Sequence, residues 1–514
     1  MPKTPSEKLF RLVKSLSGSE KRYFKIFINN KGGKDNKYRK LFDAIEEQDL
    51  FNEEELQQIV YPKEQVESRK YSEMKGYLYD LILKSLQAYD EKTSVDYKLK
   101  GMLLSVRTLY KRSLFEDCKE LLYKGKKIAT KYEDFNAGLE LLRWEKQIAY
   151  AETDITYLNK EMERIEIEER ELVQQIQNIS EYRNMFFKLL VIMRKDAASL
   201  RHNSEKLSFI NPDKLVEDIK STESYKAKIL CYRVLSLFYL ATQKLDKSYE
   251  ISKKLLSQIE HQNYMIREDS TEYISALSNH IIISGSLKKF SEVRETLNKM
   301  RDIKTNTLDD EVKIYRQYYL GKFRLYIDSG DFEEGYEELK EHLKSRKKFD
   351  ENLFKKDTFY IKYFSICFGV AKYEEALHYL NEWLGMSRNI ERKDLQSLAR
   401  ILNLIIHYEM KNTDLIESLL RSTYRFLTDK EFFTKFEKKF LSSFREAIEI
   451  QSQKELRRHW KNLSEEYKRL EQELNLPDFI RWFPIKEWID AQVSGMPFAL
   501  IVKEKFEQNF SDAK

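Results

Sequence analysis

The sequence is poor in the residues that end helices and turn chains. Of its 514 residues only 14 are Gly and 7 are Pro, well below the usual shares of about 7% and 5%. β-sandwiches, barrels and doubly wound α/β enzymes need more turn residues than this. No proline falls between residues 213 and 476, and a proline inside a helix costs about 3 kcal/mol. The sequence therefore predicts an all-α protein.

Cysteine and long apolar runs are equally scarce. Cys118, Cys231 and Cys367 lie more than 100 residues apart, which excludes metal-ligand spacing and a disulfide framework. They are expected to be small core residues in a reducing compartment. Because no stretch of 18 apolar residues occurs and the N-terminal segment lacks the apolar run of a secretory signal, we expect no membrane contact and a cytoplasmic location.

The motifs of common catalytic and metal sites are absent too. The sequence contains no phosphate-binding glycine loop and no Gly-x-Ser-x-Gly motif. None of its seven His pairs with another at i, i+4, and Glu375-x-x-His378, half of a di-iron motif, has no second copy. We therefore expect no cofactor, no metal and no catalytic residue. An enzyme with an unrecognised site is a third class that nothing in the sequence supports.

Charge is nearly balanced overall but uneven along the chain. Lys and Arg total 91 and Asp and Glu 85, yet the first 40 residues hold 12 basic and three acidic residues. A basic segment attracts nucleic acid or an acidic partner. Its run of basic and aromatic residues at 21–27 could stack on single-stranded nucleic acid. However, Tyr23 and Phe27 have the helical spacing of a core face, and we favour that interpretation.

Two segments, 329–343 and 370–384, align with each other. Each has a short turn, an aromatic residue, two Glu and a small residue, followed by an amphipathic helix. Phe332 or Tyr373 is the aromatic residue, which would wedge between the two helices of a hairpin. Gly335 or Ala376 is the small residue, which would let the helices cross closely.

These segments resemble the turn and second helix of tetratricopeptide (TPR) repeats, most clearly over about residues 312–387. Related units have their markers at Phe115, Leu245, Phe290, Phe332, Tyr373 and Leu415, with Ile155 and Leu207 marking two degenerate units. Hairpins are thus expected to turn near residues 244, 289, 330, 371 and 412. The last five markers are spaced 41 to 45 residues apart, more than the 34 of TPR repeats. HEAT-like repeats and other α-solenoid hairpins are therefore alternatives to the TPR class.

Three parts follow from this pattern. Residues 1–95 are predicted to form a basic helical N-terminal module, 96–428 the TPR-like repeats, and 429–514 two long helices with a short helical tail. The second long helix carries an apolar stripe that we call the C-terminal seam: Leu456, Trp460, Leu463, Tyr467, Leu470 and Leu474. The preceding helix offers a matching stripe: Phe433, Phe436, Phe440 and Phe444. We predict an antiparallel hairpin within the chain that caps the solenoid, and a monomer.

The resemblance also implies a function. TPR-like superhelices bind partners on a concave face lined by the first helix of each hairpin, where seven polar residues would lie: Gln317, Arg324, Thr358, Ser365, Arg400, Asn403 and His407. We hypothesise a non-enzymatic protein-interaction scaffold or adaptor that captures a protein or peptide, with Arg324 and Arg400 as anchors for an acidic segment. The alternative is a nucleic-acid-binding regulator with the repeats as sensor. The six acidic residues within 46–55 disfavour it, because they would repel phosphate.

Overall fold

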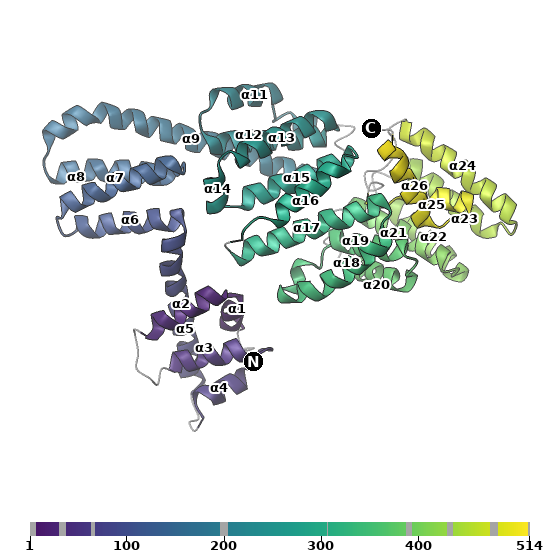
Figure 1. Ribbon diagram of the computed structural model, residues 1–514, viewed down its shortest axis with the longest axis horizontal. Coiled ribbons are helices and arrows are strands. Elements are labelled where there is room, and N and C mark those ends of the chain that lie inside the picture. Colours follow the sequence, from purple (N-terminus) through teal and green to yellow (C-terminus); the bar gives the residue numbers. More distant parts are fainter. Residues whose placement is uncertain are drawn as a thin grey trace. The chain divides into compact units, whose positions relative to one another are not determined.

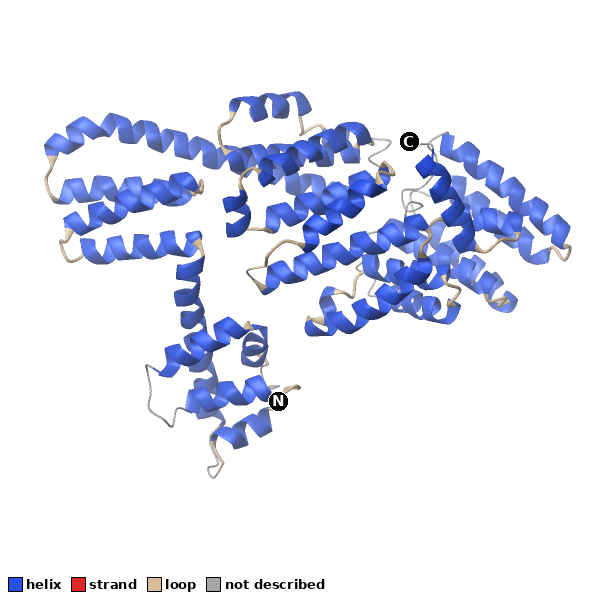
Figure 2. Ribbon diagram, viewed as in Figure 1, coloured by secondary structure: helices blue, strands red, loops and turns tan. Residues whose placement is uncertain are grey.

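The computed structural model describes residues 7–29, 37–62, 67–195, 204–305, 307–386, 393–428, 435–472 and 482–511. Throughout these ranges the regular elements are helices and no strand occurs (Figure 2). The predicted all-α fold is therefore confirmed. Within the same ranges, no helix has the length and apolarity to cross a membrane. The chain forms two compact units, one of residues 1–180 with 224–226, the other of 181–223 with 227–514. The three-part division at 95 and 428 stays a prediction.

The first unit begins with a small helical module. Its helices are α1 (Lys8–Ser15), α2 (Gly18–Asn29), α3 (Lys37–Glu47), α4 (Glu53–Val60) and α5 (Ser68–Thr93). Asn52 caps the start of α4, where its side chain accepts a hydrogen bond from the Glu55 amide (3.3 Å). Apolar residues at helical spacing form the core, in which the rings of Phe24 and Phe42 lie 4.6 Å apart.

Four longer helices follow: α6 (Val95–Tyr110), α7 (Phe115–Lys131), α8 (Phe135–Ala151) and α9 (Ile155–Lys195). Three turns of one kind connect them, each with a single residue in the left-handed conformation, namely Ser113, Glu133 and Thr153. Helices α6, α7 and α8 pack in chain order around a shared apolar core (Figure 1). Cys118 is fully buried there, and all three cysteines are free and buried, as the sequence predicts.

The second unit contains the end of α9 and most of the hairpins. Its helices are η1 (Ser204–Leu207), α11 (Pro212–Ser221), α12 (Tyr225–Ala241), α13 (Leu245–Glu260), α14 (Asn263–Glu268), α15 (Thr271–Ser286), α16 (Phe290–Arg301), α17 (Leu308–Ser329), α18 (Phe332–Ser345), η2 (Arg346–Lys348), η3 (Glu351–Leu353), α19 (Asp357–Gly369), α20 (Tyr373–Gly385), α21 (Lys393–Glu409), α22 (Thr413–Thr428), α23 (Lys435–Glu449), α24 (Gln453–Gln472), α25 (Ile485–Ser494) and α26 (Phe498–Ser511). Helices α15 and α17 pack against each other, as do α17 and α19, so neighbouring hairpins touch through their first helices (Figure 1).

The hairpin turns of this unit repeat one backbone motif. A left-handed residue lies two positions before the second helix of each hairpin: Gln243, Lys288, Gly330, Ala371 and Lys411. After four of them, the next amide donates to the carbonyl five residues back, as Lys372 does to Cys367 (2.9 Å). This is the Schellman arrangement, which satisfies carbonyls at a helix end. The five predicted turn positions are confirmed.

Not all of the marker residues of the repeat units lie at the predicted position. Phe332 and Tyr373 are the first residues of α18 and α20, as predicted. Leu415 is instead the third residue of α22. Leu207 was the wrong marker, because it ends the short helix η1, and Asn211 then caps the separate helix α11.

Equivalent side chains connect consecutive hairpins. Tyr336, the fifth residue of α18, donates to both carboxylate oxygens of Glu375, the third residue of α20 (2.8 and 2.9 Å). Tyr249 and Glu292 hold the same positions on α13 and α16, and they form the same bond. Each bond joins residues 43 or 39 positions apart in the chain, about one repeat. Contacts of this kind are expected of a repeat array, where each unit touches its neighbours.

Replacing the small residues at the hairpin crossings is expected to destabilise the protein. A Cβ added at Gly335 would lie 3.1 Å from the Cβ of Tyr326, and Ala376 is fully buried. Gly335→Leu and Ala376→Leu should each lower the free energy of unfolding by about 1–3 kcal/mol, because overpacking forces neighbours to move. Thermal melts measure this, with Gly285→Leu as control, since nothing lies within 4 Å of a Cβ there. Unchanged midpoints would show that Gly335 and Ala376 are not at close crossings.

The C-terminal seam is covered within the chain, as predicted. Trp460, Leu463, Tyr467 and Leu470 are buried. Helix α23 packs against α24, with the ring of Phe444 5.7 Å from that of Trp460. Phe433 and Leu474 lie outside the described residues. Helix α25 also packs on α24, a second cover that the sequence did not indicate. The monomer stays a prediction.

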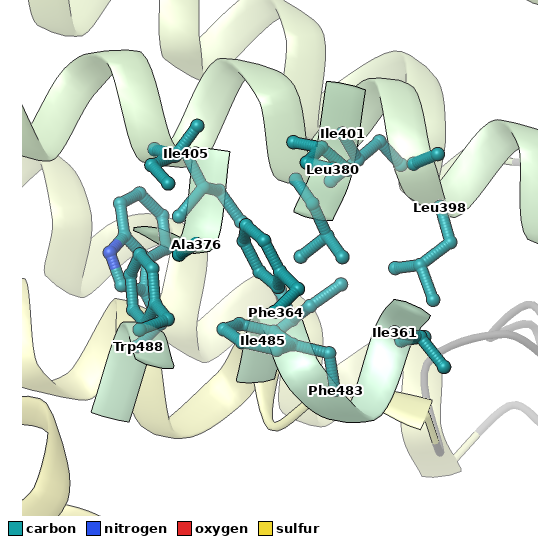
Figure 3. Packing of buried hydrophobic residues seen from close by; sticks show 14 of the residues in the cluster. Ile361, Phe364, Ala376, Leu380, Leu398, Ile401, Ile405, Phe483, Ile485 and Trp488 are labelled. Atoms are coloured by element: carbon teal, nitrogen blue, oxygen red, sulfur yellow. The ribbon is translucent and has the colours of Figure 1, made fainter. Parts of the chain in front are cut away.

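Helix α19 is enclosed by its neighbours. Every residue from 359 to 368 is buried. The rings of Phe364 and Phe368 pack 5.8 and 5.4 Å from that of Phe483, which lies two residues before the start of α25. Figure 3 shows Phe364 beside Phe483 and Ile485, with Trp488 close by. Residues after 481 therefore complete the core around α19.

Candidate functional site

The first four predicted groove residues lie on α17 and α19. Gln317 accepts a hydrogen bond from the Ser278 hydroxyl of α15 (2.8 Å), and Arg324 donates to Asp328 (2.6 Å). Thr358 is half-buried. The expectation for Ser365 was wrong: its side chain is fully buried and its hydroxyl donates to the Ile361 carbonyl (2.7 Å), so it faces no groove.

The other three predicted residues, on α21, do not occupy positions equivalent to those of Gln317, Arg324 and Thr358. Gln317 and Thr358 each lie 13 residues before the left-handed residue of their own turn. The same position on α21 is Leu398, and the counterpart of Arg324 there is Ile405, both fully buried. The misplaced marker at 415 explains the error. Since successive residues are about 100° apart around a helix, a shift of two residues turns the expected face by about 200°.

Arg400, Asn403 and His407 therefore occupy another face of α21. The Arg400 guanidinium lies 4.0 Å from the ring centroid of Phe426 on α22, and burial lowers the pKa of Arg400. His407 Nδ1 is 3.1 Å from the Asn412 amide, and burial lowers its pKa as well. The Asn403 side-chain oxygen is buried without a hydrogen-bond partner. Arg400 thus packs on the second helix of its own hairpin, on a face of α21 other than the predicted one.

Sequence reasoning missed Lys362, which lies between Thr358 and Ser365 at helical spacing. It is only 3% exposed, and its ammonium nitrogen has no hydrogen-bond partner. Burial, and then the charge of Arg324, hold its pKa well below the ordinary value, against the opposing effect of Asp328. The nitrogen lies 5.3 Å from the ring centroid of Trp482. The i, i+4, i+7 spacing from Thr358 was the signal that could have found it.

A buried Ser–His–Glu chain joins α13, α15 and α16. Ser252 Oγ lies 2.8 Å from His280 Nδ1, and His280 Nε2 lies 3.1 Å from Glu292. Serine, histidine and glutamate follow one another here in the order nucleophile, base and orienting acid, as they do in catalytic triads. Ser252 and His280 are 1% and 2% exposed, however, and Ser252 also donates to the Tyr249 carbonyl (2.8 Å). A nucleophile must be reachable by substrate, so this chain is a packing feature of the hairpins.

The half di-iron motif also has a packing role. Glu375 accepts the hydrogen bonds from Tyr336 that connect consecutive hairpins. Across the part of the chain that the structure describes, no three His, Cys, Asp or Glu side chains gather in a way that could hold a metal ion.

Several cations of the N-terminal module are paired with acids of the same module. Lys25 bridges Asp43 (2.9 Å) and Glu46 (2.8 Å), and Lys21 lies 3.6 Å from Glu46. Lys14 donates to the Glu46 carbonyl (2.8 Å). The carboxylates of Asp43 and Glu46 thus offset part of the positive charge that the sequence places at the start of the chain.

Binding to nucleic acid is therefore expected to be weak. It should be indifferent to sequence and disappear at physiological salt, because such binding depends on released counterions. Fluorescence anisotropy with two unrelated labelled oligonucleotides across a salt series measures this. Tight, sequence-dependent binding at physiological salt would instead favour the regulator.

The geometry thus assembles only part of the predicted site. Gln317, Arg324 and Thr358 keep partly open side chains on the first helices of two neighbouring hairpins. Comparison with protein-family models, curated proteins and solved structures found no match to this chain.

Proposed function

We propose that this protein is a non-enzymatic interaction scaffold, built of TPR-like helical hairpins, that binds a protein or peptide partner. The observation that carries the proposal is the left-handed turn that each hairpin repeats, together with the Tyr–Glu bond that joins two pairs of consecutive hairpins. Repeat arrays of this kind present extended concave surfaces, which they use for binding. The free, buried cysteines support a cytoplasmic location.

The partner would contact the first helices of the hairpins at α17 and α19. Arg324 is the strongest anchor there, because its side chain is 36% exposed and already binds the carboxylate of Asp328. A carboxylate on the partner would compete with Asp328 for the guanidinium, whose planar donors suit paired recognition. Gln317 and Thr358 would add neutral hydrogen bonds. Arg400 and Ser365 have no part in this surface.

Crosslinked capture from the native host tests this surface. Wild-type protein and Arg324→Glu are compared by quantitative mass spectrometry, with Arg421→Glu as a control, because Arg421 is exposed on α22. We expect one or more partners to be lost at least tenfold with Arg324→Glu and kept by the control. Equal capture by both variants would contradict binding at this surface.

The regulator is the less supported function. Its main support was the basic start of the chain, and the pairing of Lys21 and Lys25 with acids of the same module weakens that support. The salt series described above decides between the two.

A further inference from the structure

One face of α6, within the first unit, carries a row of exposed residues that we call the α6 stripe. Its members recur at alternating intervals of three and four residues, so they lie along one side of the helix: Tyr97, Lys100, Leu104, Arg107 and Lys111. At 1.5 Å per residue the stripe is about 21 Å long. Leu99, Leu103 and Val106 are buried in the core of the unit, so the stripe has no part in that core.

Most of the positive charge of the stripe has no acidic partner. Lys100 donates to Asp96, one turn earlier on the same helix (2.6 Å). Arg107 and Lys111, by contrast, form no ion pair or side-chain hydrogen bond with any residue that the structure describes. Residues 95–112 hold five basic residues and one acid. The first unit therefore presents uncompensated positive charge on α6, whereas several cations of the N-terminal module are paired.

Apolar side chains lie between these cations. Leu104 is 65% exposed, and Tyr97 is 39% exposed. Leu104 is four residues after Lys100 and three before Arg107, so cations flank it on both sides along the helix. Covering an exposed leucine is favourable when the covering group is apolar, and the cations attract carboxylates. The stripe is thus complementary to a ligand that supplies both kinds of group.

This combination favours a protein ligand over nucleic acid or a membrane. Phosphate groups would match the cations but would place a charged backbone against Leu104. A membrane-binding helix inserts its own apolar face into the lipid, whereas the apolar face of α6 is already buried against α7 and α8. A protein segment can carry carboxylates and an apolar side chain next to one another.

We propose that the α6 stripe binds an acidic segment of a partner protein, with an apolar residue of that segment on Leu104 and its carboxylates on Arg107 and Lys111. A guanidinium can bind a carboxylate through two parallel hydrogen bonds, while the lysine acts as a point charge. The stripe belongs to the first unit, whereas α17 and α19 belong to the second. Arg324→Glu should therefore leave binding to the stripe unchanged, so either proposal can fail without the other.

Peptide selection against the full chain tests the proposal. The probe is a displayed library of random peptides, first depleted on Arg107→Glu/Lys111→Glu to remove those that bind elsewhere, and then selected on wild type. We expect the selected peptides to carry an excess of Asp and Glu and a large apolar residue. In fluorescence anisotropy their affinity should be at least tenfold lower for Arg107→Glu/Lys111→Glu and severalfold lower for Leu104→Ser. Affinity should also fall as salt rises, because exposed charges are screened.

A second double variant controls for the change in net charge. The side chains of Lys160 and Arg170 on α9 are 81% and 76% exposed. Lys160→Glu/Arg170→Glu reverses the same number of charges and should bind the peptides as wild type does. All substituted positions are exposed, so each variant should keep its fold, which circular dichroism checks.

The proposal is overturned if no acidic peptide remains after the depletion, or if the two double variants weaken binding equally. It is also overturned if a labelled oligonucleotide or a phosphatidylserine vesicle binds wild type more tightly than the peptides do and loses this binding in Arg107→Glu/Lys111→Glu. The stripe would then be a site for nucleic acid or for lipid. A wild-type dimer that this variant converts to a monomer in light scattering would instead identify a second copy of the chain as the occupant.

Discussion

Leu463→Asp is expected to lower the free energy of unfolding by about 4–5 kcal/mol. Leu463 is 2% exposed in the hairpin of α23 and α24. The substitution removes a buried leucine, which alone costs about 2–5 kcal/mol. It also leaves a carboxylate in an apolar site without a partner. So large a loss can consume most of the stability of a domain.

Denaturant unfolding measures this loss, and Asn462→Asp is the matched control. It introduces the same carboxylate one residue away at an exposed position, where surface changes usually stay within about 0.5 kcal/mol. Light scattering on the same samples gives the mass, and we expect a monomeric wild type. A wild-type dimer that Leu463→Asp converts into a folded monomer would show instead that the seam joins two copies.

Gly330→Ala is expected to destabilise the protein by about 2–5 kcal/mol. Gly330 has φ +76°, where a residue with a Cβ is strained by about 1–2 kcal/mol. Its added Cβ would also lie 2.7 Å from the backbone nitrogen of Lys503. Backbone cannot move aside as a side chain can, so α26 would have to shift, adding about 1–3 kcal/mol.

Ala371→Gly is the control in the equivalent turn. Ala371 already holds a left-handed conformation, with φ 56°. Glycine would relieve that strain, while the added freedom of the unfolded chain offsets about 0.5–1 kcal/mol of the gain. We expect a change close to zero in thermal and denaturant unfolding. If Gly330→Ala were equally silent, α26 would not lie against this turn.

The sequence was sufficient for the helices and for most of the hairpin turns. The low content of glycine and proline predicts the helices, and the recurring aromatic residue predicts the turns. Both predictions use local preferences of the chain, which hold wherever a segment lies in the folded protein. Two leucine markers, at 207 and 415, failed although Leu245 does begin α13. Leucine serves equally well inside any amphipathic helix, so a leucine alone does not fix the position of a turn. The cover that α25 adds to α24 could not be foreseen, since it joins segments separated by an interval that carries no periodic signal.

The candidate site was harder to predict, because the direction in which a side chain faces depends on the exact position of its residue along the helix. A marker placed at Leu415 rather than Thr413 moved three expected residues from one side of α21 to another. Lys362 was overlooked since a lysine in an apolar helix is usually read as solvent-exposed. The ion pairs between α7 and α8, Lys119 with Glu152 and Lys126 with Glu145, join ordinary residues whose pairing across two helices is visible only in three dimensions.

The enclosure of α19 has a consequence for how the chain is made. During synthesis α19 leaves the ribosome more than 100 residues before Phe483 and α25, which complete its surroundings. At translation speeds of about 5–20 residues per second, Phe364 and Phe368 stay without that cover for several seconds. Chaperones that bind exposed aromatic segments would have their main opportunity on this protein during that interval.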